Sequence, residues 1–254
     1  MSDNRWVRDV STPAGTHEGF NPVFPSIEVV YRTDPDALAA VLPPPLSAPP
    51  DARVHVRCTD IHLDLPGGHV HDEKVGFFAV DALHDGTVGE YPLLIPIDLE
   101  SAIAISRERY GEPKKLADIE MSRDGDHVHF SITRNGVTFI EVAGDVVESL
   151  PVPEPYPSAQ FWFKFSPSVS GRGFDGDPLL VQVDQVRSPQ VLERVEGKLE
   201  LRDLATDPVV DLPVLDVESI RWTVRTTTND ARVLGPVDPV AFEPFAYSRY
   251  DMAR

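Results

Sequence analysis

The amino-acid sequence predicts a mainly β fold, either a large antiparallel sheet or a closed barrel, with only a few short helices. The 254 residues include 25 prolines and 16 glycines, which cut the sequence into short segments and leave no long helical pattern. Ten of these segments alternate between apolar and polar residues or are rich in β-branched residues, as strands are. An Asn135-Gly136 pair joins two of them, and this pair readily takes the positive φ angles of a tight hairpin.

The predicted strands follow one another along most of the chain. Turn residues separate them, so antiparallel pairing is the arrangement that we expect. The segment around Trp162 is apolar on both faces and is expected to be a central, buried strand. The predicted strands are Ile27–Arg32, Arg53–Asp64, Val75–Ala82, Tyr91–Ile97, His127–Thr133, Val137–Val147, Phe161–Phe165, Leu179–Val186, Lys198–Arg202 and Asp216–Thr227.

Two short helices are expected between these strands. Asp34, which directly precedes a proline, is a good N-cap for a helix over Asp36–Leu42. A second helix is expected over residues 98–107, with Asp98 or Ser101 as its cap. No internal repeat or low-complexity linker divides the chain, so we expect one domain over residues 1–254.

Composition excludes several classes of partner. Asp and Glu total 41 against 23 Lys and Arg, and the formal charge of −18 repels nucleic acids and anionic lipid surfaces. The N-terminal residues include acids and lack an apolar segment, so we expect a cytoplasmic protein without a membrane partner. Cys58 is the one cysteine, and it supports neither an intrachain disulfide nor a cysteine-based zinc site.

The clearest candidate for chemistry is a pair of lysines. The chain has only five lysines, and two of them, Lys114 and Lys115, stand together between Pro113 and Leu116. A lysine amine attacks a carbonyl only when it is unprotonated, which requires a pKa well below the usual value of about 10.4. Burial or a neighbouring ammonium lowers the pKa of a lysine. We therefore expect Lys114 to be a nucleophile whose pKa is lowered by burial and by Lys115; the alternative is a solvated pair at a turn.

Several short motifs occur in the order and with nearly the spacing of the acetoacetate decarboxylase family, which the sequence resembles from Tyr31 to Val214. The resemblance implies a cone-like antiparallel β-barrel, a homo-oligomer and a small keto acid substrate, with no cofactor. The motifs are Tyr31-Arg32-Thr33-Asp34, Asp36-Ala37-Leu38, Pro43 to Leu46, Ala102-Ile103-Ala104 with Arg107-Glu108, Pro113-Lys114-Lys115-Leu116 and Asp211-Leu212-Pro213-Val214.

The resemblance also assigns catalytic roles. Lys114 takes the place of the family's Schiff-base lysine, and Lys115 takes the place of its neighbour. Glu73 takes the place of an active-site glutamate if two residues are inserted, and otherwise that place falls on Val75. Glu112, beside the lysines, is the second candidate for the acid and base.

Two departures concern the substrate. Phe24 stands where the family has an arginine, and a second family glutamate falls near His55. A cation that would hold the substrate carboxylate is therefore missing from its family position. Arg32 is a candidate replacement, and Phe24 and Tyr91 are the other expected substrate-binding residues.

These departures favour one reaction over another. The expected function is a Schiff-base lyase that condenses pyruvate with an aldehyde and dehydrates the product. The alternatives are a true acetoacetate decarboxylase and a non-catalytic barrel that binds a small molecule.

A metal site is a separate alternative. His69 and His71 are two residues apart, a spacing that puts both on one face of a strand, and Asp72 and Glu73 follow them. A polar hairpin tip is the competing interpretation, because Pro66-Gly67-Gly68 interrupts this segment. We expect no metal.

Overall fold

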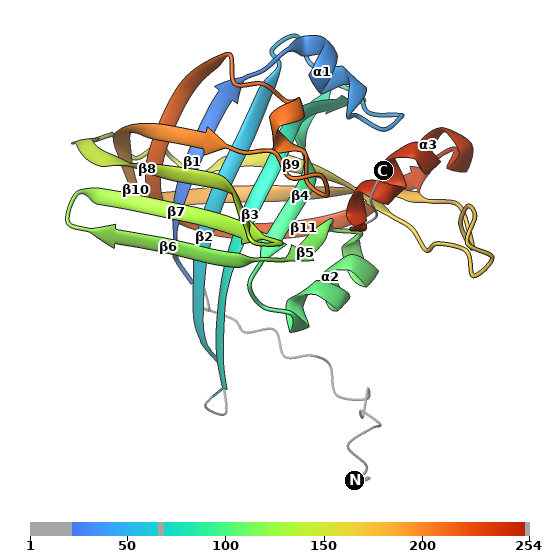
Figure 1. The fold of residues 1–254 in the computed structure, drawn as a ribbon, viewed down its shortest axis with the longest axis horizontal. Coiled ribbons are helices and arrows are strands. Elements are labelled where there is room, and N and C mark those ends of the chain that lie inside the picture. The colour runs from blue at the N-terminus through green and yellow to red at the C-terminus, as the bar shows by residue number, and fades with distance from the viewer. Residues whose placement is uncertain (1–21, 66–68, 252–254) are drawn as a thin grey trace, which may run out of the picture.

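Eleven strands form one curved sheet over residues 22–65 and 69–251, which are the residues that the computed structural model describes (Figure 1). The side chains of Leu65 and His69 lie outside this description. The strands are β1 (Phe24–Arg32), β2 (Arg53–Leu65), β3 (His69–His84), β4 (Thr87–Ile97), β5 (Lys114–Leu116), β6 (Asp118–Asp124), β7 (His127–Arg134), β8 (Val137–Ser149), β9 (Tyr156–Lys164), β10 (Leu179–Leu201) and β11 (Asp216–Pro236). The helices are α1 (Pro35–Ala40), α2 (Ser101–Tyr110) and α3 (Pro239–Ala246), with 3-10 turns η1 (Val209–Asp211) and η2 (Tyr247–Arg249).

Seven of the strands close into a ring. The pairing runs β11, β1, β2, β3, β4, β9 and β10, and β10 pairs back with β11. β10 is long enough to pair with β9 through its first half and with β8 through its second half, from which β7 and β6 continue. The expected mainly β fold with few short helices is confirmed. The sheet is mixed, because β4 pairs in parallel with β5 and β9.

The main apolar core lies on the outer face of the ring. There, Val29, Val56 and Phe78 from β1, β2 and β3 pack in one buried cluster with Phe130 and Ile140 from β7 and β8. The buried residues alternate along each strand, as expected for a sheet with two different faces. The other face of the ring strands is therefore directed toward the inside of the ring.

The first predicted helix is confirmed in its cap, whereas the second is capped differently. Asp34 Oδ1 accepts hydrogen bonds from the backbone N–H groups of Asp36 and Ala37, 2.8 and 3.0 Å away. The prediction that Asp98 or Ser101 caps α2 was wrong. The N-cap is Glu100 and makes no side-chain cap bond, because Asp98 Oδ1 instead accepts a hydrogen bond from the backbone of β3.

Several elements differ from the prediction. β5, β6 and α3 were not predicted, and the predicted strands Leu179–Val186 and Lys198–Arg202 belong to the single strand β10. Pro189 lies within β10 at a register shift, which accommodates its missing N–H. None of the described helices is long and apolar enough to cross a membrane.

Candidate active site

The two neighbouring lysines project from opposite faces of β5. In the parallel pairing with β4, Lys114 is in register with Ile95, and Lys115 is in register with Pro96. Successive side chains of a strand point to opposite faces, and residues in register share a face. Lys114 therefore shares a face with Ile95, which packs against Phe77 of β3 in a small buried cluster.

This face is the inside of the ring. The guanidinium of Arg57 lies 4.2 Å from the ring centroid of Phe77. Arg57 also belongs to a buried group of charged residues that come from β1, β2, β4, β10 and β11 and that meet across the ring. We call Glu28, Arg57, Glu90, Arg187 and Arg225 the arginine layer.

Glu90 is the centre of the arginine layer. Its carboxylate accepts a hydrogen bond of 3.1 Å from Arg57 and two of 3.0 Å from Arg187. Gln160 of β9 donates a further hydrogen bond of 3.2 Å to the same carboxylate. Arg225 pairs with Glu28, the second carboxylate of the layer. Side chains from six of the seven ring strands thus contribute to one polar group in the interior.

The charges in this layer are stabilised by one another. Burial alone would raise the pKa of Glu90, but the guanidinium groups of Arg57 and Arg187 hold that pKa well below its usual range. Arg225 and Arg57 likewise outweigh burial and lower the pKa of Glu28. Both carboxylates are therefore ionised at neutral pH.

A pair formed by His55 and Asp81 borders the arginine layer. His55 Nε2 lies 2.7 Å from Asp81 Oδ1, and His55 Nδ1 lies 4.0 Å from Glu90. Burial opposes the charged imidazole, but the hydrogen bond to Asp81 and the charge of Glu90 raise the pKa of His55. His55, near which the second family glutamate falls, therefore lies beside the buried carboxylate of Glu90 in this chain.

Lys114 contacts a carboxylate on its own segment. Its Nζ lies 3.3 Å from Glu112 Oε2, and the two side chains are only 12% and 13% exposed. Glu112 Oε2 is buried and makes no well-aligned hydrogen bond with any described residue. An amine and a carboxylate at this distance can exchange a proton directly, which is what imine formation and the later proton transfers require.

An unpartnered donor faces the same interior. Trp162 lies two residues beyond Gln160 on β9 and so shares its interior face. The indole Nε1 of Trp162 is buried without a hydrogen-bond partner among the described residues. The Trp162 ring packs edge to face against Tyr110, the last residue of α2, at 5.5 Å between centroids. A buried free N–H of this kind is available to a ligand.

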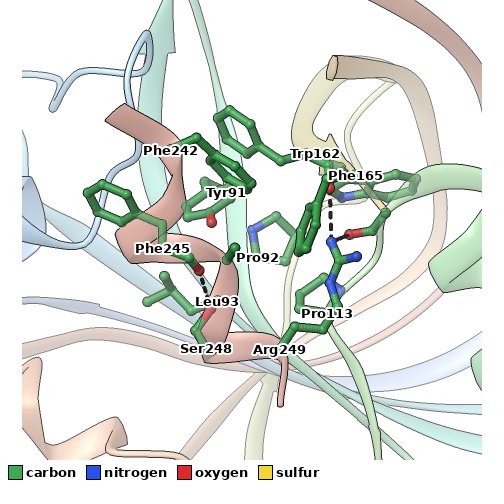
Figure 2. Close-up of a pocket in the computed structure, with 13 residues that line it drawn as sticks. Tyr91, Pro92, Leu93, Pro113, Trp162, Phe165, Phe242, Phe245, Ser248 and Arg249 are labelled. Carbon is green, nitrogen blue, oxygen red and sulfur yellow. Dashed lines mark hydrogen bonds between the residues drawn. The ribbon is translucent and has the colours of Figure 1, made fainter. Parts of the chain in front are cut away.

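Two arginines hold the backbone that carries Lys114. Arg107 Nε donates to the carbonyl of Lys114 at 2.8 Å, and Arg107 Nη2 donates to the carbonyl of Arg249 at 2.8 Å. Arg249 donates in turn to the carbonyls of Gly111 and Phe163. Figure 2 shows the side chain of Arg249 beside Pro113. Sequence reasoning missed Arg107 and Arg249 as positioning residues, because their acceptors are backbone atoms.

The turn before Lys114 requires glycine. Gly111 follows α2 with φ of +84°, a conformation that side chains with a Cβ rarely adopt. A Cβ at this position would lie 2.2 Å from the carbonyl oxygen of Phe163. The absence of a side chain lets the segment approach β9 closely, and this approach fixes where β5 begins at Lys114.

Lys115 belongs to a different group of charges. Its Nζ lies 2.8 Å from Asp207 Oδ1, 3.3 Å from Asp251 Oδ1 and 3.0 Å from the carbonyl of Thr206. Arg134 pairs with the same two carboxylates. The ammonium of Lys115 is thus held on the outer face, and the structure does not bring it beside the amine of Lys114.

Glu73 shares the interior side of β3 but not the contacts of Lys114. It lies four residues before Phe77, and its side chain is 9% exposed. Its Oε2 is 3.2 Å from His71 Nε2 without a well-aligned hydrogen bond. Among the described residues, Glu112 and not Glu73 is the carboxylate in contact with Lys114.

The expected substrate-binding residues are dispersed. Phe24 is in register with Arg225 and so shares the interior face. Arg32 is half exposed and pairs with Asp51 and Glu218 at 3.5 and 3.0 Å. Tyr91 is in register with Val80, on the outer face. Phe24 and Arg32 thus lie on the strand face that Lys114 shares, but Arg32, in register with Arg53, is at the exposed end of it.

A cavity with a volume of about 520 Å³ lies on the outer face. Tyr91, Phe78, Asp207 and Tyr250 are among its lining residues, whereas Lys114 is not. A second cavity of about 20 Å³ lies between Tyr91, Pro113 and Arg249 and has room for roughly one water molecule (Figure 2). The larger cavity therefore borders the residues that hold Lys115.

The described side chains contain no group of three or more metal-ligating residues. His71 contacts Glu73, and His62 lies 2.5 Å from Asp72. The side chain of His69, one of the two expected histidines, is outside the described residues.

Comparison with known proteins gives a family match. The family model described as acetoacetate decarboxylase (ADC) matches residues 12–236. Acetoacetate decarboxylase of Clostridium beijerinckii (strain ATCC 51743 / NCIMB 8052) is 27% identical over 218 residues, which cover 82% of this chain and 83% of that protein.

Solved structures share the fold. Acetoacetate decarboxylase from Legionella pneumophila superposes with a TM-score of 0.71 at 20% identity, over 89% of this chain and 94% of that one. The enduracididine biosynthesis enzyme MppR complexed with pyruvate superposes with a TM-score of 0.68 at 18% identity, over 89% and 95% of the two chains.

Proposed function

The chain belongs to the acetoacetate decarboxylase family, and from that membership we propose that it is a lyase that forms a Schiff base between Lys114 and a small keto acid. The observation that carries the proposal is the buried contact of 3.3 Å between Lys114 Nζ and Glu112 Oε2 inside the ring. Lys114 stands where the family motif has its Schiff-base lysine. Ile95 and Phe77 form an apolar cluster on the face of Lys114, and Trp162 of β9 belongs to a second apolar cluster that faces the interior.

The chemistry begins with proton transfer from the ammonium of Lys114 to Glu112. The free amine adds to the keto carbon, and loss of one water molecule gives a protonated imine. This cation accepts an electron pair from the neighbouring carbon, so it replaces the Lewis acid that a metal would supply. We propose that Glu112 moves the protons in these steps, because Glu112 is the carboxylate in contact with Nζ.

Two reactions are open to this imine. From acetoacetate, carbon dioxide leaves and the resulting enamine is protonated. From pyruvate, a base removes a proton from the methyl group, the enamine carbon bonds to an aldehyde, and the new hydroxyl leaves as water. Hydrolysis then returns the free lysine and an unsaturated keto acid.

We propose that condensation and dehydration with pyruvate is the reaction of this chain. Phe24 stands where the resemblance places the family's arginine, and the arginine layer brings three guanidinium groups into the interior. Guanidinium groups stabilise the carboxylate in the ground state. This stabilisation is lost in decarboxylation, because the electron pair moves into the imine and carbon dioxide leaves as a neutral molecule. The similarity to MppR, whose complex contains pyruvate, favours pyruvate as the substrate. The curated relatives named acetoacetate decarboxylase favour the decarboxylase instead.

Both reactions should be measured on one preparation. Carbon dioxide release is followed with acetoacetate, and the ultraviolet absorbance of an unsaturated product is followed with pyruvate and a set of aldehydes. We expect the absorbance to rise while carbon dioxide release stays near the uncatalysed rate, and both to be absent in Lys114→Ala. Rapid carbon dioxide release that Lys114→Ala abolishes, without any condensed product, would establish a decarboxylase. A folded protein that gives neither signal and no adduct on reduction would be a binding protein.

We also propose that residues 1–254 form one catalytic domain, since the ring uses strands from β1 to β11. The homo-oligomer that the family implies stays a prediction. Light scattering on the purified protein would test it.

A further inference from the structure

The arginine layer carries more positive than negative charge. The arginine layer combines three guanidinium groups with two carboxylates, Glu28 and Glu90. The neighbouring His55 and Asp81 form a pair of opposite charges and leave the difference unchanged when His55 is protonated. One buried positive charge thus lacks a partner in the layer, and buried charges in proteins are ordinarily paired.

The arginines also have donors to spare. Arg57 donates one hydrogen bond, from Nη2 to Glu90, and its Nη1 is 3.8 Å from Glu28, beyond hydrogen-bond distance. Arg187 directs its hydrogen bonds to Glu90 and Gln185 from the same atom, Nη2. A guanidinium has five N–H donors, and its fork matches the two oxygens of a carboxylate. Within the described residues, the arginines of the layer therefore have more N–H donors than they have hydrogen-bond acceptors.

Arg57 lies in one row with Lys114. Lys114 is in register with Ile95, the register of β3 and β4 aligns Ile95 with Phe77, and Phe77 is in register with Arg57. These are three strand spacings, or about 14 Å between the Cα positions of Lys114 and Arg57. Both end residues have long side chains, and the two between them are apolar. The row has a nucleophile at one end, a cation at the other and an apolar wall for a short carbon chain.

We propose that the arginine layer is the subsite for the carboxylate of the keto acid, and that Arg57 is the residue that contacts it. This inference rests on the proposed function of Lys114. The preferred substrate class is a 2-oxo acid that keeps its carboxylate, such as pyruvate. The three arginines of this subsite are on β2, β10 and β11, and none is on β1, where Phe24 stands in the place of the family's arginine.

The test compares charged and neutral carbonyl compounds of similar shape. The concentration of pyruvate that gives half-maximal borohydride trapping on the intact protein is measured beside that of pyruvamide, whose amide is uncharged. We expect pyruvate to be trapped at concentrations about 10- to 100-fold lower, the range that a hydrogen bond between charged groups provides. In Arg57→Gln, the value for pyruvate should rise by a similar factor, and the value for pyruvamide should change less than about twofold.

Arg53→Gln is the matched control. Arg53 lies on the same strand and face as Arg57, but it pairs with Asp51 and Glu218 near the surface, and its side chain is 33% exposed. This variant should leave both values unchanged. Equal trapping of pyruvate and pyruvamide by the unaltered protein would overturn the proposal, even if Arg57→Gln does not fold. Equal loss for both compounds in a folded Arg57→Gln would overturn it as well.

The outcomes separate this inference from the proposed function. If no carbonyl compound is trapped, the Schiff base is refuted, and calorimetric binding of pyruvate to the unaltered protein and to Arg57→Gln still decides the subsite. Binding weakened about tenfold or more by Arg57→Gln would support the subsite without the chemistry. Binding that is absent, or equal in both proteins, would refute it.

Discussion

Lys114 and Lys115 are adjacent in the sequence, but exchanging each for methionine should affect different properties. Lys115→Met should lower the stability of the fold, and Lys114→Met should abolish the reactivity. Lys115 contacts three oxygens, from Thr206, Asp207 and Asp251, and its side chain is 3% exposed. Breaking a buried ion pair costs about 3–5 kcal/mol of folding free energy, because it leaves an uncompensated charge. Arg134 still pairs with Asp207 in Lys115→Met, so we expect the lower end, about 3 kcal/mol.

The same substitution at Lys114 should cost less stability and remove all reactivity. Within the part of the chain that the structure describes, Lys114 contacts a single carboxylate, that of Glu112. Urea unfolding measures the free energy of both variants, and borohydride trapping with pyruvate, counted per folded molecule, measures their reactivity. We expect Lys115→Met to be clearly less stable than the unaltered protein but fully reactive. Lys114→Met should be more stable than Lys115→Met but should form no adduct.

Two results would refute this division of roles. A folded Lys115→Met that has lost trapping would show that the second ammonium acts on the first, as the sequence suggested. A Lys115→Met protein as stable as the unaltered one would show that the contacts with Asp207 and Asp251 contribute little.

Three further predictions follow from the site and its surroundings. Gly111→Ala should lower the unfolding free energy by more than about 1 kcal/mol and reduce trapping, because φ at this position is +84° and the Cβ would meet Phe163; unchanged unfolding and trapping would contradict the account of this turn. The raised pKa of His55 means that its pairing with Asp81 stabilises the fold fully below about pH 6.5 and that this contribution is lost as the pH rises through the folded-state pKa. In His55→Asn, the free energy of unfolding, measured by urea unfolding, should therefore decrease less as the pH rises above about 6.5. His127→Asn, which removes an exposed pair, is the control and should not change this pH dependence. Treatment with a chelator should leave trapping and turnover unchanged, since the imine itself accepts the electron pair; loss restored by zinc or manganese would favour a metal site at His71.

The strand pattern was predictable, whereas the role of the inner face was not. Alternation along β1, β2 and β3 is visible in the sequence, and it assigns Val29, Val56 and Phe78 to a core. The same rule interprets charged residues on the opposite face, such as Arg57, as solvent-exposed. Arg57 is buried because β10 pairs with β11 and closes the ring, and such long-range pairing leaves no local signal.

Individual elements show the same limit. Asp238 directly precedes Pro239 at the start of α3, which is the signal that correctly predicted α1 from Asp34, so α3 could have been found. β5 has only three residues, too few for a periodic pattern. The sequence therefore could not tell which of its two lysines faces the interior, and the family resemblance supplied that assignment.

The cation that replaces the family's arginine could not be identified from sequence position alone. Phe24 is the predicted departure from the family, and Arg32, the predicted replacement cation, pairs with surface carboxylates. The in-register neighbour of Phe24 is Arg225, from the far end of the chain. Only the strand register connects these two residues.

The most direct test of the central proposal is to locate the covalent adduct. The protein is incubated with pyruvate and borohydride, and the reduced adduct is assigned by peptide mass spectrometry among its five lysines. We predict one pyruvate-derived adduct, on Lys114, and none in Lys114→Met. An adduct on Lys164 or Lys198 with Lys114 unmodified would contradict the proposal.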